Sequence, residues 1–264
     1  MGKSIAVTNE KGGVGKTTVS VQLAHKLSES DFKVLLVDND SSGDATTALF
    51  GEDIPETIKK GNQPEGVSNT IKMYNTDTEP KPIQVRDNLF LLGATDALSV
   101  LKGADMEPVY EFCDSIEVLK EDFDYIIIDC PPSFGLLFTS AIMATDGIII
   151  PVIPEDFAFN AAKKVEHRIK QMNRRMGANQ KKIAGVIANK VKNNPTPKSV
   201  THYLEELKDN FGSLLFNTQI NETIKISDAI SLQESITDYA KPDTKAVKQI
   251  SAFTDEVIAR MEKI

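Results

Sequence analysis

The stretch Lys11-Gly12-Gly13-Val14-Gly15-Lys16-Thr17-Thr18 decides the fold of this chain. An apolar run over residues 4–8 precedes it, and Val19, Leu23 and Leu27 follow at helical spacing. This order predicts a strand, a glycine loop and a helix. In such a loop the backbone N–H groups surround a chain of phosphates, and the helix N-terminus adds its dipole. The segment therefore predicts a nucleotide site.

Two lysines lie in this loop. We expect Lys16 to neutralise charge on the β- and γ-phosphates, the Thr17 hydroxyl to ligate Mg²⁺ and Thr18 to reach the α-phosphate. The ordinary loop of this type has a glycine where this chain has Glu10, and the second lysine, Lys11, comes next. Because Lys11 would lie beside a polyanionic nucleotide, we predict that it also contacts phosphate.

The arrangement K-G-G-V-G-K-T-T resembles the deviant Walker A box of the ParA/MinD ATPases, and the chain is similar to ParA from residue 3 to about residue 250. Three further segments carry the resemblance. Residues 34–40 resemble the second strand and switch I, residues 124–133 resemble Walker B with switch II, and residues 220–229 resemble the segment before the last helices. The resemblance is to a short ParA, whose first strand starts at residue 4 with no helix-turn-helix before it.

Three aspartates end predicted strands. Asp129 closes an apolar run, where a carboxylate is well placed to hold Mg²⁺ through water. The resemblance implies that Asp40 orients the attacking water and that Asp38 supports the metal or the switch. Carboxylates after a strand also serve as helix N-caps, which is the alternative for this pair. The family usually reads D-P-Q-G-N at switch I, and this chain departs from it at Ser41 and Ser42.

The resemblance also implies the partners. Lys11 would reach across an ATP-bridged homodimer to the partner's nucleotide, and hydrolysis would release the dimer. A ParB-like adaptor would stimulate that hydrolysis, through a basic peptide that suits an acidic surface. Asn189 ends a predicted strand and resembles the residue that reads the adenine edge, although a polar residue closing a strand is an equally good interpretation.

Alternation of apolar runs and amphipathic stretches predicts the architecture. Strands are expected at 4–8, 34–38, 89–93, 124–129, 146–152, 183–189 and 214–219. With crossover helices between them, they predict an α/β fold with a doubly wound, mostly parallel sheet and helices on both faces. Loops 9–18, 38–44 and 129–135 then meet at the carboxyl edge of the sheet, where ligands bind. We expect one domain over 1–264, with an irregular excursion at about 51–88.

Composition narrows the class of protein. Of 264 residues, 41% are apolar, which is enough for a core. There is no run of 18 apolar residues and no apolar leader, so we expect no membrane span and a cytoplasmic protein. The two cysteines, Cys113 and Cys130, are too few for a disulfide framework and do not suit an iron–sulfur cluster bridged between subunits.

Charge is segregated along the chain. The formal net charge is −8, yet residues 163–198 contain eleven Lys and Arg against one acid, Glu166; this segment is therefore +10 and the remainder −18. Apolar residues at 162, 165, 169, 172 and 176 predict a helix with basic flanks. Such a face is often merely solvated, but the segregation favours a polyanion. The resemblance to ParA implies that this polyanion is double-stranded DNA, bound without sequence preference. The candidate contacts are Lys163, Lys164, Arg168, Arg174, Arg175, Lys190, Lys192 and, through the resemblance, Lys225.

Three other functions compete with a nucleoid-associated partition ATPase. A MinD-like membrane-positioning ATPase would need a basic amphipathic C-terminal helix, but residues 254–264 have three acids and two bases. A nitrogenase-reductase-like protein would need cluster cysteines. A metabolic kinase or ligase would need an acceptor pocket, for which the sequence has no signal, and Lys11 argues against it.

Overall fold

The computed structural model describes residues 1–75, 79–155, 158–176, 182–192 and 197–264. In this part of the chain seven strands form one sheet in the order β3-β4-β2-β5-β1-β6-β7. Neighbouring strands are parallel except for β3 and β4. The strands are β1 (Lys3–Val7), β2 (Val34–Asp38), β3 (Ile83–Arg86), β4 (Leu89–Leu92), β5 (Tyr125–Asp129), β6 (Gly147–Val152) and β7 (Lys182–Ala188).

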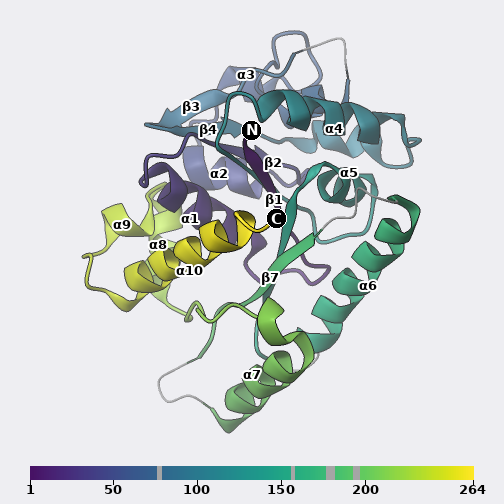
Figure 1. The fold of residues 1–264 in the computed structure, drawn as a ribbon. Helices are drawn as coiled ribbons and strands as arrows, with labels where there is room; N and C mark the ends of the chain where they lie inside the picture. The colour runs from purple at the N-terminus through teal and green to yellow at the C-terminus, as the bar shows by residue number, and fades with distance from the viewer. Residues whose placement is uncertain (76–78, 156–157, 177–181, 193–196) are drawn as a thin grey trace.

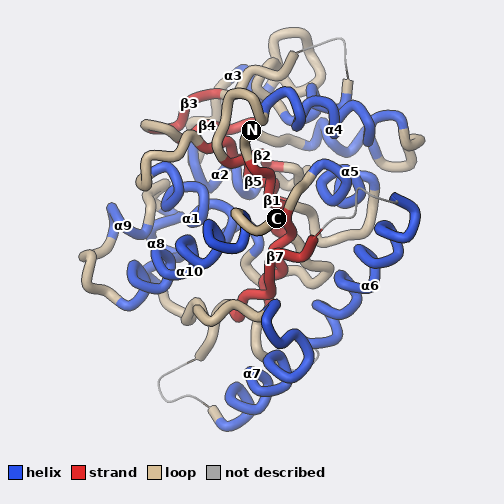
Figure 2. Tube along the Cα trace, in the orientation of Figure 1, coloured by secondary structure: helices blue, strands red, loops and turns tan. Residues whose placement is uncertain are grey.

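Helices connect the strands and cover both faces of the sheet (Figures 1 and 2). The α-helices are α1 (Lys16–Ser28), α2 (Asp44–Phe50), α3 (Glu56–Lys59), α4 (Glu107–Leu119), α5 (Leu136–Ala144), α6 (Ala158–Met176), α7 (Lys198–Phe211), α8 (Ile224–Ser231), α9 (Ile236–Tyr239) and α10 (Lys245–Met261). Short 3₁₀ helices are η1 (Thr70–Tyr74), η2 (Asp96–Leu101) and η3 (Gly212–Leu214).

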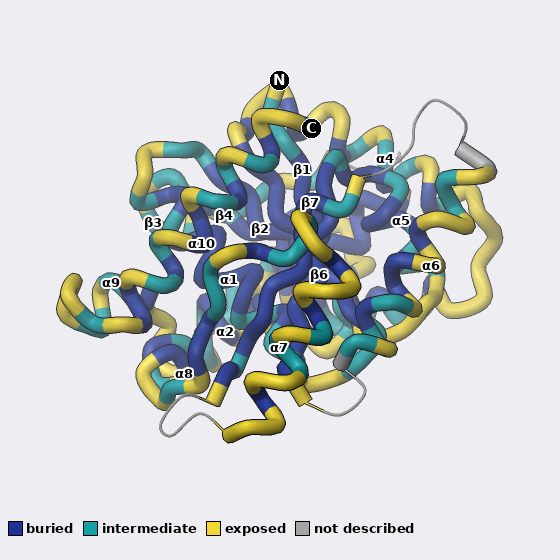
Figure 3. Tube along the Cα trace, turned by 60° about the horizontal axis from the view of Figure 1, so that its bottom comes forward, coloured by how far each residue is buried: buried dark blue, intermediate teal, exposed yellow. Residues whose placement is uncertain are grey.

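Two large apolar clusters lie on opposite faces of the sheet. One contains side chains of α1, α2, α8 and α10, and the other contains side chains of η1, α4, α5, α6 and α7. Successive residues of β5 alternate between them, since Ile127 belongs to the first cluster and Ile126 and Ile128 to the second. The central strands are therefore buried on both sides, as Figure 3 shows. This confirms the predicted doubly wound, mostly parallel fold.

The last predicted strand, 214–219, is wrong. Phe216 donates one backbone hydrogen bond to Val186, but the next two N–H groups do not extend the ladder. Those of Asn217 and Thr218 donate instead to the carboxylate of Glu256 on α10, at 2.9 and 2.7 Å. A side chain thus satisfies the donors that a strand would have used.

The segment 51–88, which was predicted to be an irregular excursion, contains the strand β3. β3 pairs antiparallel with β4 at the sheet edge, and the turn between the two strands contains Asn88, whose φ is 60°. Only four residues long, with Pro80 and Pro82 just before it, β3 gave no clear strand signal in the sequence. The rest of 51–88 includes α3 and η1.

Helix α10 packs its apolar side inward. Ile250, Phe253, Val257 and Met261 are all buried, in the same cluster as α1. In the described residues no helix is both long enough and apolar enough to cross a bilayer.

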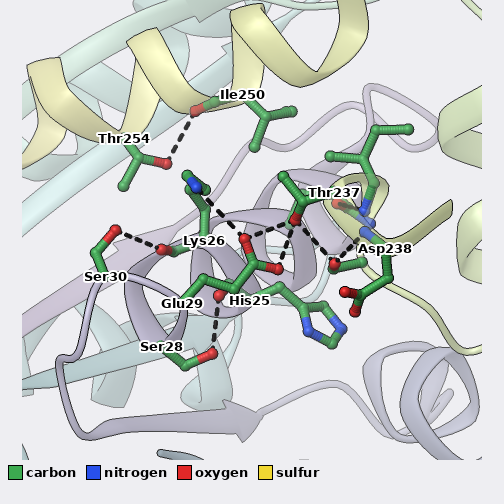
Figure 4. Close-up of polar contacts among 12 residues, drawn as sticks. His25, Lys26, Ser28, Glu29, Ser30, Thr237, Asp238, Ile250 and Thr254 are labelled. Atoms are coloured by element: carbon green, nitrogen blue, oxygen red, sulfur yellow. Dashed lines mark hydrogen bonds and ion pairs between the residues drawn. The ribbon is translucent and has the colours of Figure 1, made fainter. Parts of the chain in front are cut away.

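Side chains near the C-terminal end of α1 make hydrogen bonds to α9 (Figure 4). Thr237 donates its hydroxyl to the carboxylate of Glu29, and Gln22 accepts the N–H of Ile236 at 2.9 Å. His25 lies between these contacts, 2% exposed, and neither of its ring nitrogens has a hydrogen-bond partner in the described residues. Burial, aided by Arg86, lowers the pKa of His25 from 6.5 to about 4.

The lowered pKa of His25 therefore makes the stability of the folded chain depend on pH. Because its folded pKa lies below its unfolded pKa, its contribution is complete above pH 6.5 and is lost as the pH falls towards about 4. Between pH 6.5 and about 4, we expect protonation of His25 in the unfolded chain to lower the free energy of unfolding by up to about 3 kcal/mol, and His25→Leu to remove this decrease. Urea unfolding of both proteins from pH 7.5 to 4.5 measures it. Parallel pH profiles would contradict the prediction.

Candidate nucleotide-binding site

The glycine loop joins β1 to α1 in the predicted place. Gly13 and Gly15 have φ values of 75° and 87°, which a side chain would strain. A Cβ on Gly12 or Gly13 would meet nothing within 4 Å, so this part of the loop leaves open space for a ligand to approach the backbone. Lys16 starts α1 and is 8% exposed, and the ion pairs of the described residues do not include it. Its ammonium is thus available to an anion.

The two residues that follow β7 donate hydrogen bonds to carbonyl groups of the glycine loop. Asn189, 2% exposed, donates Nδ2 to the carbonyl of Val14 at 2.8 Å, and Lys190 donates Nζ to the carbonyl of Gly13 at 2.9 Å. A Cβ on Gly15 would collide with that same Nδ2. The structure therefore brings Asn189 to the predicted site, but in contact with the loop itself. Lys190, predicted for DNA, also lies at the loop.

The carboxylate of Asp129 anchors the start of α1. It accepts the Thr17 hydroxyl at 2.7 Å and the Ser20 hydroxyl at 2.9 Å, at the end of β5. Asp129 is 1% exposed. Burial raises its pKa to about 7, with a further contribution from the negative charge of Asp38, while Lys16 acts in the opposite direction. Ser20 was not predicted; its place on α1, one turn after Lys16, was the available signal.

Asp38 lies beside Asp129 in the register of β2 and β5. Its Oδ2 accepts both the N–H and the hydroxyl of Thr46 in α2, at 2.8 and 2.7 Å. Burial raises the pKa of Asp38 to about 6. The N-cap residue of α2 is Gly43, which has no side-chain cap, so Asp38 is not the helix N-cap that the sequence left open as an alternative; its carboxylate is instead turned towards α2 and holds the first turn of that helix through Thr46. Two buried carboxylates and a hydroxyl on adjacent strands and α1 are still an oxygen-rich set that fits a hard divalent cation.

Switch I follows directly. Asp40 is partly exposed, and its Oδ1 accepts the N–H of Ser42 at 3.0 Å. Its carbonyl accepts the N–H of Gly43, which has a φ of 69° and precedes α2. The loop thus forms a tight turn without the proline and glutamine usual in the family, and it holds Asp40 at the same sheet edge as Asp129.

Asn39, between the two switch aspartates, is a residue that sequence reasoning missed. It is fully buried, accepts the hydroxyl of Tyr74 at 2.6 Å and donates Nδ2 to the carbonyl of Leu137 at 2.8 Å. Tyr74 also contacts Ser140 at 2.7 Å. Asn39 therefore ties switch I to η1 and to α5, the helix that follows switch II.

Lys11 is paired within its own chain. Its ammonium lies 2.6 Å from Oε1 of Glu155, which follows β6, and its backbone N–H is donated to Asn9. Both side chains of the ion pair are partly exposed, 38% for Lys11 and 50% for Glu155. Such a pair contributes little stability, about 0–1 kcal/mol, so Lys11 is easily released.

The predicted DNA residues separate into groups. On α6 the buried side chains of Ala162, Val165 and Ile169 confirm the apolar stripe. Lys163 turns inward over the ring of Phe211 and pairs with Glu166 at 3.1 Å. The exposed remainder on described side chains is Lys164, Arg168 and Arg174 on α6, Lys192 after β7 and Lys225 on α8; that of Arg175 lies outside them.

A glycine loop at a strand–helix junction, a lysine at its end and buried aspartates on the neighbouring strands define a P-loop nucleotide-binding protein of the doubly wound class. A family model described as an AAA domain matches residues 2–184. The sporulation initiation inhibitor protein Soj of Bacillus subtilis is 32% identical over 237 residues, 88% of each chain. The chromosome partitioning protein ParA of Myxococcus xanthus is 29% identical over 246 residues, 89% of this chain and 81% of that protein. The chain belongs to the ParA family of partition and positioning ATPases.

Solved structures share the fold. A Cyanothece McdA variant in complex with ATP superposes with a TM-score of 0.83 at 22% identity, covering 98% of this chain and 96% of the other. MinD of Pyrococcus horikoshii with Mg-ADP gives 0.75 at 23% identity, covering 97% and 96%. These likenesses confirm the architecture.

Asn189 provides a test of how the site is built. If its main role is to hold the loop, Asn189→Ala leaves a buried carbonyl unpaired and weakens ATP and GTP alike, by about tenfold each. Titration with fluorescent analogues of both nucleotides measures this, with Asn210→Ala as a control because that asparagine lies on α7. A loss confined to ATP would instead support recognition of adenine.

Proposed function

We propose that this chain is a Mg²⁺-dependent ATPase of the ParA type. ATP would join two copies, the dimer would bind DNA without sequence preference, and adaptor-stimulated hydrolysis would release it, so that a large cargo is segregated or positioned. The observation that carries this proposal is the pair of lysines in one glycine loop, Lys16 buried and Lys11 partly exposed at its rim.

Binding of ATP rests on the loop and on Lys16, with Val14, Thr17 and Thr18 completing the phosphate contacts. The Thr17 hydroxyl and Asp129 would hold Mg²⁺, with Asp38 as a second carboxylate close by. When bound, the metal offsets the charge of the phosphate oxygens. The raised pKa values of Asp38 and Asp129 support this assignment, because a nearby cation would relieve the cost of two buried negative charges.

Hydrolysis needs a positioned water more than covalent chemistry. Asp40 would orient that water, since it is the partly exposed carboxylate of the switch and its turn is fixed by Ser42 and Gly43. Lys11 would leave Glu155 and contact the partner's nucleotide, a step that the weak surface ion pair permits. A γ-phosphate offers Lys11 more counter-charge than ADP does, which makes dimerisation respond to nucleotide.

The exposed cations of α6, with Lys192 and Lys225, would contact DNA phosphates. Dimerisation doubles this surface, and each neutralised phosphate adds about −0.9 to the slope of log affinity against log salt. An adaptor of the ParB kind and a cytoplasmic, nucleoid-associated location complete the proposal. The buried apolar side of α10 gives no support to the MinD-like membrane alternative.

Lys11→Ala tests the dimer. We expect the variant to bind ATP as a monomer with near wild-type affinity but to form no ATP-dependent dimer, because the charge that reaches the partner is gone. Light scattering with ATP and with ADP reports the mass. Lys16→Ala is the comparison and is expected to lose ATP binding itself. A Lys11→Ala dimer with ATP would show that the cross-dimer role is wrong.

DNA binding tests the proposal as a whole. A duplex of random sequence is expected to bind tightly with ATP and weakly with ADP or without nucleotide, and to dissociate as salt rises. Arg168→Ala/Arg174→Ala should reduce the magnitude of the salt slope by about 2 to 4, since each dimer loses four charges. Lys245→Ala/Lys248→Ala on α10 is the charge-matched control. Equal effects of the two double variants, or no binding with ATP, would contradict the DNA surface.

A further inference from the structure

A cavity lies far from the glycine loop. It encloses about 460 Å³ between α4, the segment 79–82 and the residues that precede β2 and β5. Lys33 and Phe123 line it at the amino ends of those strands, whereas Asp38 and Asp129 close the carboxyl ends. The length of a five-residue strand, roughly 16 Å, therefore separates this cavity from the nucleotide site.

Two aromatic rings line this cavity and already hold a cation. Phe90 and Phe123 meet edge to face with their ring centroids 5.4 Å apart. The ammonium of Lys33 lies 4.9 Å from the centroid of Phe123 and 5.5 Å from that of Phe90. The negative faces of such rings attract ammonium and guanidinium groups. Val118, 62% exposed, adds apolar surface at the rim.

Carboxylates surround the aromatic rings. Glu111 and Asp114 on α4, Asp122 after it and Glu79 opposite all line the cavity, against two cations, Lys33 and Lys81. None of the four carboxylates is in an ion pair among the described residues. Oε2 of Glu111 is moreover buried without a hydrogen-bond partner there. A buried unpaired carboxylate oxygen is costly, and a bound cationic donor would remove that cost.

The cavity lies next to η1, the element that reaches switch I, because Asn75 at the end of η1 lines it. Ser115 on α4 donates its hydroxyl to the carbonyl of Met73 at 3.2 Å, and Asn75 at the cavity follows Tyr74 directly. Tyr74 in turn donates its hydroxyl to Asn39, between the two switch aspartates. A ligand that moves η1 would thus act on the residue that fixes switch I.

We propose that this cavity is the docking site for a basic segment of a partner protein, with arginine or lysine side chains beside apolar ones, and that docking is transmitted to Asn39 through Tyr74. The charge balance and the aromatic lining select the occupant, because an acidic segment would meet four unpaired carboxylates. The identification of the partner as the hydrolysis-stimulating adaptor rests on the proposed function. The match between the cavity and a basic segment is independent of that function, because it follows from the residues that line the cavity.

Binding to the full chain tests the site. The probe is a fluorescein-labelled peptide alternating arginine and leucine, with a glutamate–leucine peptide of equal length as the negative control. Asp114→Asn/Asp122→Asn should weaken binding of the basic peptide by about tenfold. Glu107→Gln/Glu121→Gln removes the same charge from α4 and the following loop, outside the cavity, and should leave affinity near wild type.

Lys33→Gln has the opposite expected sign. It removes the cation that lies over the rings and should strengthen binding several-fold, which a merely structural role of Lys33 would not do. Tyr74→Phe keeps the ring against Phe112 but removes the hydroxyl. It should therefore bind the peptide normally while losing any peptide-dependent change in ATP hydrolysis.

The outcomes separate this inference from the proposed function. No basic-peptide binding to the wild type, or equal losses in the two charge-matched variants, overturns the docking site while leaving DNA binding with ATP unaffected. Normal peptide stimulation of Tyr74→Phe overturns the transmission through Tyr74. Peptide binding by a protein that fails to bind DNA with ATP supports the docking site and overturns only the proposed function.

Discussion

The structure of the site depends on one buried carboxylate, that of Asp129. It accepts hydroxyl groups from Thr17 and Ser20, so it fixes the first turn of α1 and with it the end of the glycine loop. Its neighbour Asp38 holds α2 in the same way through Thr46. Two helices are thus oriented by charges that are themselves costly to bury, as the raised pKa values of both groups indicate. The site is therefore preorganised for a nucleotide at a cost to the stability of the ligand-free protein.

The contacts around these aspartates join parts of the chain that are far apart in sequence. Asn189 and Lys190 support the loop from the end of β7, and Tyr74 connects switch I with α5. Each link is a short polar contact inside or at the edge of a packed core, where an unpaired group is expensive. A change at the phosphates would therefore meet a structure in which both switch loops and the adjoining helices are tied together.

Sequence patterns that span only a few residues predicted the features of the structure that such short segments determine. The glycine loop, the apolar strands and the stripe on α6 were all predicted, because glycine spacing and hydrophobic periodicity act within a few residues. Contacts set by topology were not. The loop-supporting role of Asn189 depends on a residue 175 positions away, and Glu256 replaces a strand at 217–218 by accepting its N–H groups. β3 was missed because four residues beside prolines give too short a pattern. The buried positions of Asn39 and Tyr74 likewise have no signature in the sequence.

The packing of α10 on α1 has a consequence for how the chain is made. Val19, Leu23 and Leu27 share their apolar cluster with Ile250, Phe253 and Val257. The central strand β1 likewise pairs with β5 and β6, which come much later in the chain. During synthesis α2 and β2 can cover part of α1 early, but the part that packs on α10 stays uncovered until residues 250–257 have been made. The packing of α1 can therefore be completed only late in translation, and apolar surface exposed until then favours aggregation of the incomplete chain.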